Sequence, residues 1–175
     1  MTSQEKLGRF EEQISPHLGS AYNLARWLTG NHEDAEDVVQ ESFLRAFSAL
    51  HNLRRQNPKP WLLAIVRNTS MTWVKRNRCA VARTGMEDDA DNTSEPSPDP
   101  EESLLISCDR ELVRNALEQL PPDFREAVLL REIEGLTYKE IAASIGVPVG
   151  TVMSRLARGR IGLRRLLASA RKELA

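Results

Sequence analysis

The sequence predicts an all-α protein: two small helical domains joined by a flexible acidic linker, with a helix-turn-helix in the C-terminal domain. Three observations support this class. Apolar residues recur at helical spacing and no strand pattern appears. An acidic, proline-containing segment interrupts the helical pattern, and a glycine turn joins two amphipathic stretches near the C-terminus. A length of 175 residues suits one domain or two small ones.

The composition is typical of a globular protein, with 28% charged and 41% hydrophobic residues. No apolar run approaches the ~20 residues that a membrane span needs, and the first residues lack the apolar core of a secretory signal. We therefore expect a cytoplasmic protein without membrane insertion. Two cysteines, Cys79 and Cys108, are too few for a disulfide framework or a zinc site, and we expect plain thiols.

The net charge of −1 conceals strong segregation of charge along the chain. Residues 51–85 hold eight Lys or Arg and no acid, whereas residues 86–111 hold ten acids and one arginine. Residues 148–175 hold seven Lys or Arg against one acid. Because contact with nucleic acid depends on local charge, the two basic segments are candidates for it.

The predicted first domain covers residues 1–84 and contains helical patterns in order. The first runs over residues 7–29, and Asn31 then provides a start for a second helix that ends near Leu50. A polar loop over 51–59 leads into a third helix, opened by Pro60 and extending to about Arg78.

Residues 85–103 form the predicted linker, because this segment has three prolines, many acids and too little apolar surface to fold. The second domain covers 104–175. Its apolar pattern and prolines predict helices near 104–119, 122–134, 137–145 and 148–170.

The last two of these helices have the pattern of a helix-turn-helix. Thr137 and Glu140 have the spacing of a capping box, and Gly146 permits the turn. In the final helix Val152, Leu156, Leu163 and Leu167 share one side, while the opposite side presents Thr151, Ser154, Arg155 and Arg158. Short donors beside arginines suit a DNA major groove. The alternative is an ordinary helical hairpin with solvated charges.

The helix over 60–78 has a second unusual face. Its apolar arc contains Leu62, Leu63, Val66, Trp73 and Val74, and the opposite arc contains Trp61, Ile65, Asn68, Thr72, Lys75 and Arg76. Apolar surface for stacking, an amide and cations together suit an unpaired base and its phosphates. The alternative is a helix packed on both sides whose last cations are simply solvated.

Three collinear motifs resemble the extracytoplasmic-function sigma factors of bacterial RNA polymerase. They are DAEDVVQESFLRAF at 34–47, PWLLAIVRNTSMTWVKRNR at 60–78, and LPPDFREAVLLREIEGLTYKEIAASIGVPVGTVMSRLARGR at 120–160. The resemblance covers nearly the whole chain. It implies a promoter-melting region 2, a linker that threads the RNA channel of the polymerase, and a region 4 that binds the −35 element.

The resemblance assigns polymerase contact to the helix over 34–47. This helix would dock on the clamp helices of the largest polymerase subunit, and the polymerase flap is the further expected contact. The residues expected at this surface are Asp34, Asp37, Gln40, Glu41 and Arg45. A plain solvated face is the alternative, and a carboxylate-bridged metal site is a weaker one because Glu-x-x-His pairs are absent.

The resemblance also assigns DNA contacts. A base flipped out of the −10 element would bind near Ile65 and Asn68, with Trp61 and Thr72 on the same arc and phosphate contacts from Arg54, Arg55, Lys75, Arg76 and Arg78. The −35 element would be bound by Arg131, Thr151, Ser154, Arg155 and Arg158. The sequence departs from its relatives at Met153 and Ala157, so its preferred promoter is expected to differ from the commonest one.

The resulting hypothesis is an alternative sigma factor that binds core RNA polymerase, recognises −35 and −10 promoter elements and promotes DNA opening. Relatives are often held inactive by an anti-sigma protein, which is therefore a possible partner. No catalytic motif, metal cluster or cofactor fingerprint is present, so we expect no enzyme activity. The alternatives are a stand-alone helix-turn-helix regulator, which would bind DNA as a dimer, and a helical enzyme or metalloprotein.

Overall fold

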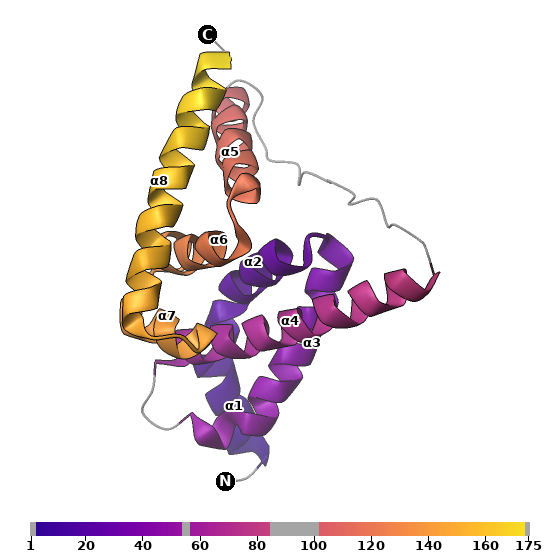
Figure 1. The fold of residues 1–175 in the computed structure, drawn as a ribbon. Coiled ribbons are helices and arrows are strands. Elements are labelled where there is room, and N and C mark those ends of the chain that lie inside the picture. Colours follow the sequence, from indigo (N-terminus) through magenta and orange to yellow (C-terminus); the bar gives the residue numbers. More distant parts are fainter. Residues whose placement is uncertain (1–2, 54–56, 85–101, 174–175) are drawn as a thin grey trace. The chain divides into compact units, whose positions relative to one another are not determined.

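The computed structural model describes residues 3–53, 57–84 and 102–173, and for 80–84 and 102–108 it describes the backbone alone. All regular structure in these ranges is helical, which confirms the predicted all-α class (Figure 1). Contacts between Cα atoms divide the chain into two compact units, Met1–Asn92 with Ala143–Ile145, and Thr93–Ala142 with Gly146–Ala175. The predicted domain limits at 84 and 104 stay a prediction, and nearly all of the predicted linker lies outside the described ranges.

The structure bears on the expectations for membrane spans and for the two cysteines. No helix within the described ranges is long and apolar enough to cross a lipid bilayer. Cys79 is an exposed free thiol, whereas the side chain of Cys108 lies outside the described residues.

The first unit begins with two helices where the sequence pattern predicted one. Helix α1 spans Ser3–Gln13, the short 3-10 turn η1 spans Ser15–His17, and α2 spans Leu18–Thr29. The prediction of a single helical stretch over 7–29 is therefore wrong. Pro16 lies in the turn, and because proline lacks an amide proton and its ring collides with the preceding helical turn, α1 cannot continue through it.

The next two helices carry most of the candidate site. Gly30 ends α2 with a φ of +88°, and the Asn31 side chain accepts a 2.8 Å hydrogen bond from the Asp34 amide, so Asn31 is confirmed as the start of α3 (His32–Ala49). A 3-10 turn, η2 (Leu50–Asn52), follows. Helix α4 spans Pro58–Thr84 and is longer than predicted at both ends.

Helices α2, α3 and α4 enclose the core of this unit (Figure 1). The ring of Phe10 on α1 packs edge-on against Phe43 and Phe47 of α3, with centroids 5.8 and 5.3 Å apart. The fully buried side chains of the core are Ile14, Ala21, Leu24, Ala25, Ala35, Val38, Ala46, Leu50, Leu53, Leu62, Leu63 and Val66.

The second unit is built on α5 (Glu102–Gln119), α6 (Pro122–Val128), α7 (Tyr138–Ile145), whose last three residues are grouped with the first unit, and α8 (Val149–Glu173). The Arg125 guanidinium donates to the carbonyls of Leu117, Glu118 and Leu120, which satisfies the last carbonyls of α5. Helix α6 passes into a π-helical segment, η3 (Leu129–Ile133), so the region predicted as one helix over 122–134 changes its hydrogen-bond pattern midway.

The turn between α7 and α8 forms as the sequence predicts. The Thr137 hydroxyl accepts from the Glu140 amide at 3.2 Å, and the Glu140 carboxylate accepts from the Thr137 amide at 2.8 Å. This reciprocal pair is the capping box. Gly146 ends α7 with a φ of +72°, a left-handed conformation that favours glycine. The predicted helix-turn-helix signature is therefore present.

Candidate nucleic-acid interface

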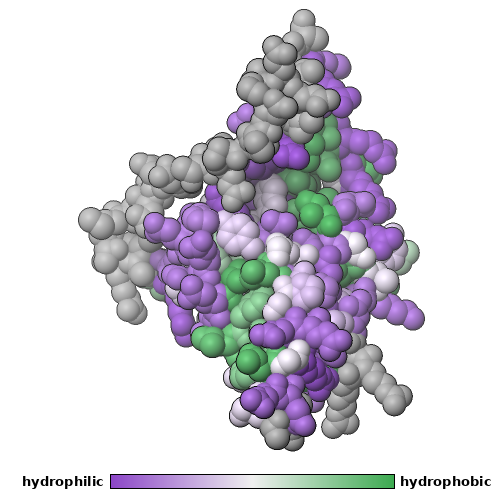
Figure 2. Space-filling model, turned by 180° about the vertical axis from the view of Figure 1, so that it is seen from behind, coloured by the Kyte–Doolittle hydropathy of each residue, from purple (hydrophilic) through white to green (hydrophobic). Residues whose placement is uncertain are grey.

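Helix α8 separates a buried stripe from an exposed basic face. Val152 and Leu156 are buried, whereas Ser154 and Arg158 are exposed and Thr151 is half-buried. The Ser154 hydroxyl donates to the Thr151 carbonyl at 3.0 Å. Figure 2 shows mostly hydrophilic side chains along the outer edge of this helix. The face therefore combines short hydroxyl groups with the exposed Arg158 guanidinium, which has no partner among the residues the structure describes, a combination that suits a major groove.

Arg155, predicted on the same face, has a partner in another helix. Its guanidinium lies 2.9 Å from a carboxylate oxygen of Asp123, in the first turn of α6. The Arg155 side chain is only 21% exposed, whereas that of Asp123 is 64% exposed. Arg155 is thus paired with another helix, which the helical wheel does not reveal.

Arg131, the remaining predicted −35 residue, is half-buried in the π-helical segment. Its guanidinium donates a 2.8 Å hydrogen bond to the Leu136 carbonyl and lies 5.1 Å from the centre of the Tyr138 ring. These contacts fix the loop that leads into α7. Arg131 therefore has a structural role in the free protein, and DNA contact would use its remaining donors.

A second ion pair ties α8 to the π-helical segment. Two nitrogens of the Arg160 guanidinium donate to one carboxylate oxygen of Glu132, at 2.6 and 2.9 Å. The hydrogen bond to Glu132 raises the pKa of Arg160, and a hydrogen bond to Tyr138 adds to this effect. Sequence reasoning did not single out this pair, because the two residues are 28 positions apart.

The predicted −10 face of α4 is solvent-accessible. Asn68, Thr72, Lys75 and Arg76 are exposed. Trp61 and Ile65 are half-buried, so each leaves part of its apolar surface open. Arg78 is also exposed, whereas Arg54 and Arg55 lie outside the described residues.

The opposite side of α4 faces the core. Thr69 and Ser70 are buried there, and their hydroxyls donate to the carbonyls of Ile65 and Val66 at 2.9 and 2.8 Å. The hydroxyls are thereby satisfied within the helix. Leu62, Leu63 and Val66 of the predicted apolar arc are also buried, whereas Trp73 and Val74 of that arc are only half-buried.

A groove of about 360 Å³ lies between α3 and α4 and joins the two predicted sites. Within it, the Arg45 guanidinium pairs with Glu41 at 2.7 Å, and the side chain of Leu44 is strongly exposed. Four predicted polymerase-binding residues and two predicted −10 residues border this groove. Its lining consists of Asp37, Gln40, Glu41, Leu44, Arg45, Thr69, Thr72, Trp73 and Arg76.

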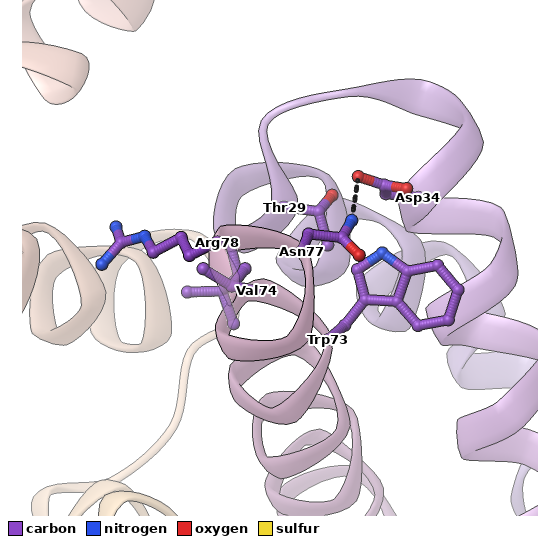
Figure 3. A pocket seen from close by; sticks show the side chains of 7 residues that line it. Thr29, Asp34, Trp73, Val74, Asn77 and Arg78 are labelled. Atoms are coloured by element: carbon purple, nitrogen blue, oxygen red, sulfur yellow. Dashed lines mark hydrogen bonds between the residues drawn. The ribbon is translucent and has the colours of Figure 1, made fainter. Parts of the chain in front are cut away.

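Asp34, the fifth predicted polymerase-binding residue, borders a different pocket. This pocket has a volume of about 500 Å³ and lies among α2, the start of α3 and the C-terminal half of α4. The Asp34 carboxylate accepts from the side-chain amides of Asn31 at 2.7 Å and Asn77 at 3.4 Å (Figure 3). Trp73 lies beside this pair, and its indole nitrogen is buried without a hydrogen-bond partner among the described residues.

Sequence reasoning missed three residues at these surfaces. Leu44 and Trp73 border the groove, and Asp123 holds Arg155. An apolar Leu44 among acids on an amphipathic helix is a sequence clue that could have identified it. Trp73 was assigned to the core arc, although it is only half-buried. No sequence pattern links Asp123 to Arg155.

Two family models match this chain, one on each unit. The model for Sigma-70 region 2 matches residues 14–79, and the model for Sigma-70 region 4 matches residues 110–161. The first range contains the α3–α4 groove and the exposed face of α4. The second contains the helix-turn-helix and both of its ion pairs.

Similar proteins include several bacterial sigma factors. The chain is 38% identical to ECF RNA polymerase sigma factor SigE of Mycolicibacterium smegmatis, over 98% of this chain and 66% of that protein. It is 34% identical to the RNA polymerase sigma-H factor of Pseudomonas aeruginosa, over 81% and 77% of the two chains. The ECF RNA polymerase sigma-E factor of Escherichia coli is 37% identical, over 73% of this chain and 70% of that protein.

A solved structure of similar fold is the sigma factor RpoE in complex with the anti-sigma factor NepR from Bartonella quintana. It aligns with a TM-score of 0.78 at 27% identity and covers 91% of this chain and 97% of that chain. An α-helical protein with one model of the sigma-70 family on each unit is a sigma-type transcription factor. The chain belongs to the extracytoplasmic-function sigma factors, so the resemblance predicted from its motifs is confirmed.

Members of this family are transcription initiation factors that bind core RNA polymerase and promoter DNA. The alternative of a stand-alone regulator is not favoured, because it would account for the helix-turn-helix and not for the match to region 2.

Proposed function

We propose that this chain is an alternative sigma factor that binds core RNA polymerase, directs it to −35 and −10 promoter elements and helps to open the DNA. The observation that carries the proposal is the face of α8. Directly after a capped helix and a glycine turn, Ser154 and Arg158 are exposed opposite the buried Val152 and Leu156. The chain performs no covalent step in this function.

The groove between α3 and α4 is the proposed contact with the clamp helices of the largest polymerase subunit. It combines the exposed Leu44 side chain with acidic and amide groups, as the centre and rim of a protein interface require. Asp37, Gln40 and Glu41 would form the polar rim. Because Thr72 and Arg76 border the same groove, polymerase and the −10 strand would bind at adjoining surfaces.

Replacing Leu44 with aspartate should weaken binding to core polymerase by at least about tenfold, because it puts a charge where apolar surface would be buried. Titration of labelled protein with core enzyme measures the effect. Leu7→Asp is the matched control, since Leu7 is 49% exposed, lies on α1 and does not border the groove. Equal affinities for the two variants would exclude the groove as the contact.

The exposed arc of α4 is the proposed site for a flipped base of the −10 element. Half-buried Trp61 and Ile65 offer apolar surface, exposed Asn68 offers an amide for the base edge, and Lys75 and Arg76 offer charge for phosphates. Arg54 and Arg55 remain further candidates for phosphate contact. Flipping a base costs a few kcal/mol, which these contacts would offset.

Replacing Asn68 with alanine should reduce transcription mainly at one −10 base pair, by a factor of about ten, because an amide that contacts a base edge discriminates among bases. Run-off transcription on templates with single −10 substitutions measures the effect. Asn23→Ala, on α2 outside this arc, is the control. An unchanged order of base preference in Asn68→Ala would remove this residue from the pocket.

The −35 element would be read by Thr151, Ser154, Arg155 and Arg158, with Arg131 close by. The second unit would also contact the polymerase flap. An anti-sigma protein is a proposed regulator, supported by the complex of RpoE with NepR, whose sigma chain is 27% identical to this one. Co-purification of the full chain with proteins from its own host would test for such a partner.

Run-off transcription with core polymerase and a library of randomised promoters tests the whole proposal. The expected result is transcription from a subset of templates that share two short elements, and only when both core polymerase and this chain are present. Tight binding to duplex DNA by a polymerase-free dimer would instead support a stand-alone regulator. No change in template choice would refute the proposal.

A further inference from the structure

Two arginines on the proposed DNA-facing side of α8 have different surroundings. Arg158 is exposed and makes no hydrogen bond or ion pair with any residue in the described ranges. Arg155 lies against α6, with its guanidinium 2.9 Å from the Asp123 carboxylate. Although the two arginines are equivalent on a helical wheel, only one has its charge balanced within the described parts of the protein.

We propose that Asp123 determines how strongly this protein discriminates between its −35 element and other DNA, by holding Arg155 and balancing its charge. Asp123 is a positioning residue and acts through Arg155. The inference rests on the proposed function, in which the second unit binds duplex promoter DNA. It assigns a role to a residue on α6, outside the helix-turn-helix.

The position of Asp123 in the fold suits it to hold a side chain in place. Asp123 lies in the first turn of α6. This helix packs closely against α8, because a Cβ atom added at Gly159 of α8 would collide with the Val128 side chain of α6. The backbone that carries the Asp123 carboxylate is therefore held in place by helix packing. The Arg155 side chain is only 21% exposed and its guanidinium is paired, so part of its conformational freedom is already lost before binding.

A side chain that is already ordered, such as Arg155, favours contacts that depend on geometry over contacts that depend on charge alone. An arginine has five donors in a planar fork, and one bond to Asp123 leaves others available for a base edge or a single phosphate. Because its orientation is already partly fixed, Arg155 loses less entropy when the correct groove is presented. Arg155 cannot adapt to a DNA sequence other than the −35 element by a free change of its side-chain conformation.

The balance of the Arg155 charge by Asp123 also increases discrimination between DNA sequences. Binding to DNA of any sequence depends on cations that neutralise phosphates and release counterions. An arginine whose charge is balanced by a carboxylate, as Arg155 is by Asp123, contributes little to this effect. Asp123 therefore lowers binding to DNA without a −35 element more than binding to the correct element.

The test uses the full chain in complex with core polymerase and compares Asp123→Asn with Glu132→Gln. Both substitutions remove one negative charge and weaken one ion pair to α8, but Glu132 holds Arg160 instead of Arg155. Equilibrium affinities are measured for promoter DNA and for the same DNA with a scrambled −35 element, over a series of salt concentrations. Circular dichroism verifies that both variants are folded.

For Asp123→Asn we expect affinity for scrambled DNA to rise about three- to tenfold and affinity for the promoter to change less than about twofold, with a salt slope steeper by about 0.9. Discrimination then falls about three- to tenfold. Glu132→Gln should leave discrimination unchanged. In an Arg155→Ala background, Asp123→Asn should have no further effect on discrimination, since the carboxylate acts through that arginine.

Two results would overturn the inference: unchanged discrimination in Asp123→Asn, or an equal change in both variants. Failure of the proposed function would look different, because the wild-type complex itself would then show no preference for the −35 element. A discrimination loss in Asp123→Asn that persists without Arg155 would also refute the proposed route.

Discussion

Replacing Gly159 with valine should lower the free energy of unfolding of the second unit by about 2–3 kcal/mol, the upper part of the range for overpacked cores. A Cβ atom at this position would lie 2.7 Å from Val128 Cγ2 and 3.1 Å from the Phe124 carbonyl oxygen. Neither neighbour can move cheaply, because one belongs to a β-branched side chain and the other to the backbone. Helices α6 and α8 must therefore separate.

The tryptophans make this effect measurable within the intact chain. Trp27, Trp61 and Trp73 all lie in the first unit. During urea denaturation, tryptophan fluorescence should report an unchanged transition for that unit. Far-ultraviolet circular dichroism should report an earlier transition for the other helices.

The matched control for this prediction is Gly150→Val. Gly150 lies near the start of α8 and is exposed, and a Cβ atom added to it would have no heavy atom within 4 Å among its described neighbours. The free energy of unfolding of the Gly150→Val variant should stay within about 0.5 kcal/mol of wild type, as is usual for substitutions at exposed sites. Equal stability of the Gly159 and Gly150 variants would show that the contact between α6 and α8 is looser than described.

Replacing Arg158 with alanine should cost about 1–3 kcal/mol of discrimination at one −35 base pair, the value of one bidentate contact to a base edge. Arg158 is exposed beside Ser154 and, within the described ranges, has no partner that would compete for its donors. The measurement is the affinity of the complex with core polymerase for promoters that carry each single −35 substitution.

Arg164→Ala serves as the comparison for Arg158→Ala. Arg164 is exposed on the same helix, but it lies beyond the residues matched by the region 4 model. Its loss should weaken binding to all sequences alike, if at all. A uniform loss in Arg158→Ala as well would show that this residue neutralises a phosphate and does not read a base.

Much of the fold could be predicted because local chemistry decides it. Asn31 and Thr137 begin helices through hydrogen bonds within four residues of sequence, and Gly146 ends one by adopting a positive φ. Buried Val152 and Leu156 follow from helical periodicity. The one helical stretch predicted over 7–29 failed because the apolar pattern continues across Pro16 although the backbone cannot.

The candidate site could be predicted in part. Helical spacing placed Asn68, Thr72 and Arg76 on an exposed arc. The same spacing could not show that Thr72 and Arg76 share a groove with Asp37 and Glu41 of α3, because that depends on how two helices pack. The family resemblance grouped Asp34 with Asp37 and Glu41, whereas the fold turns Asp34 toward Asn77 in a separate pocket.

The sequence by itself determined the helical class, most helix ends and the family, since each depends on residues close together in the chain or on motifs in a fixed order. The tertiary structure alone decided which charges are available. Arg155 and Arg158 lie on one face of one helix, but Asp123, far away in the chain, neutralises the first and, within the described ranges, leaves the second free. Coulomb interaction depends on distance in space, and only the packing of α6 against α8 brings that carboxylate within 2.9 Å.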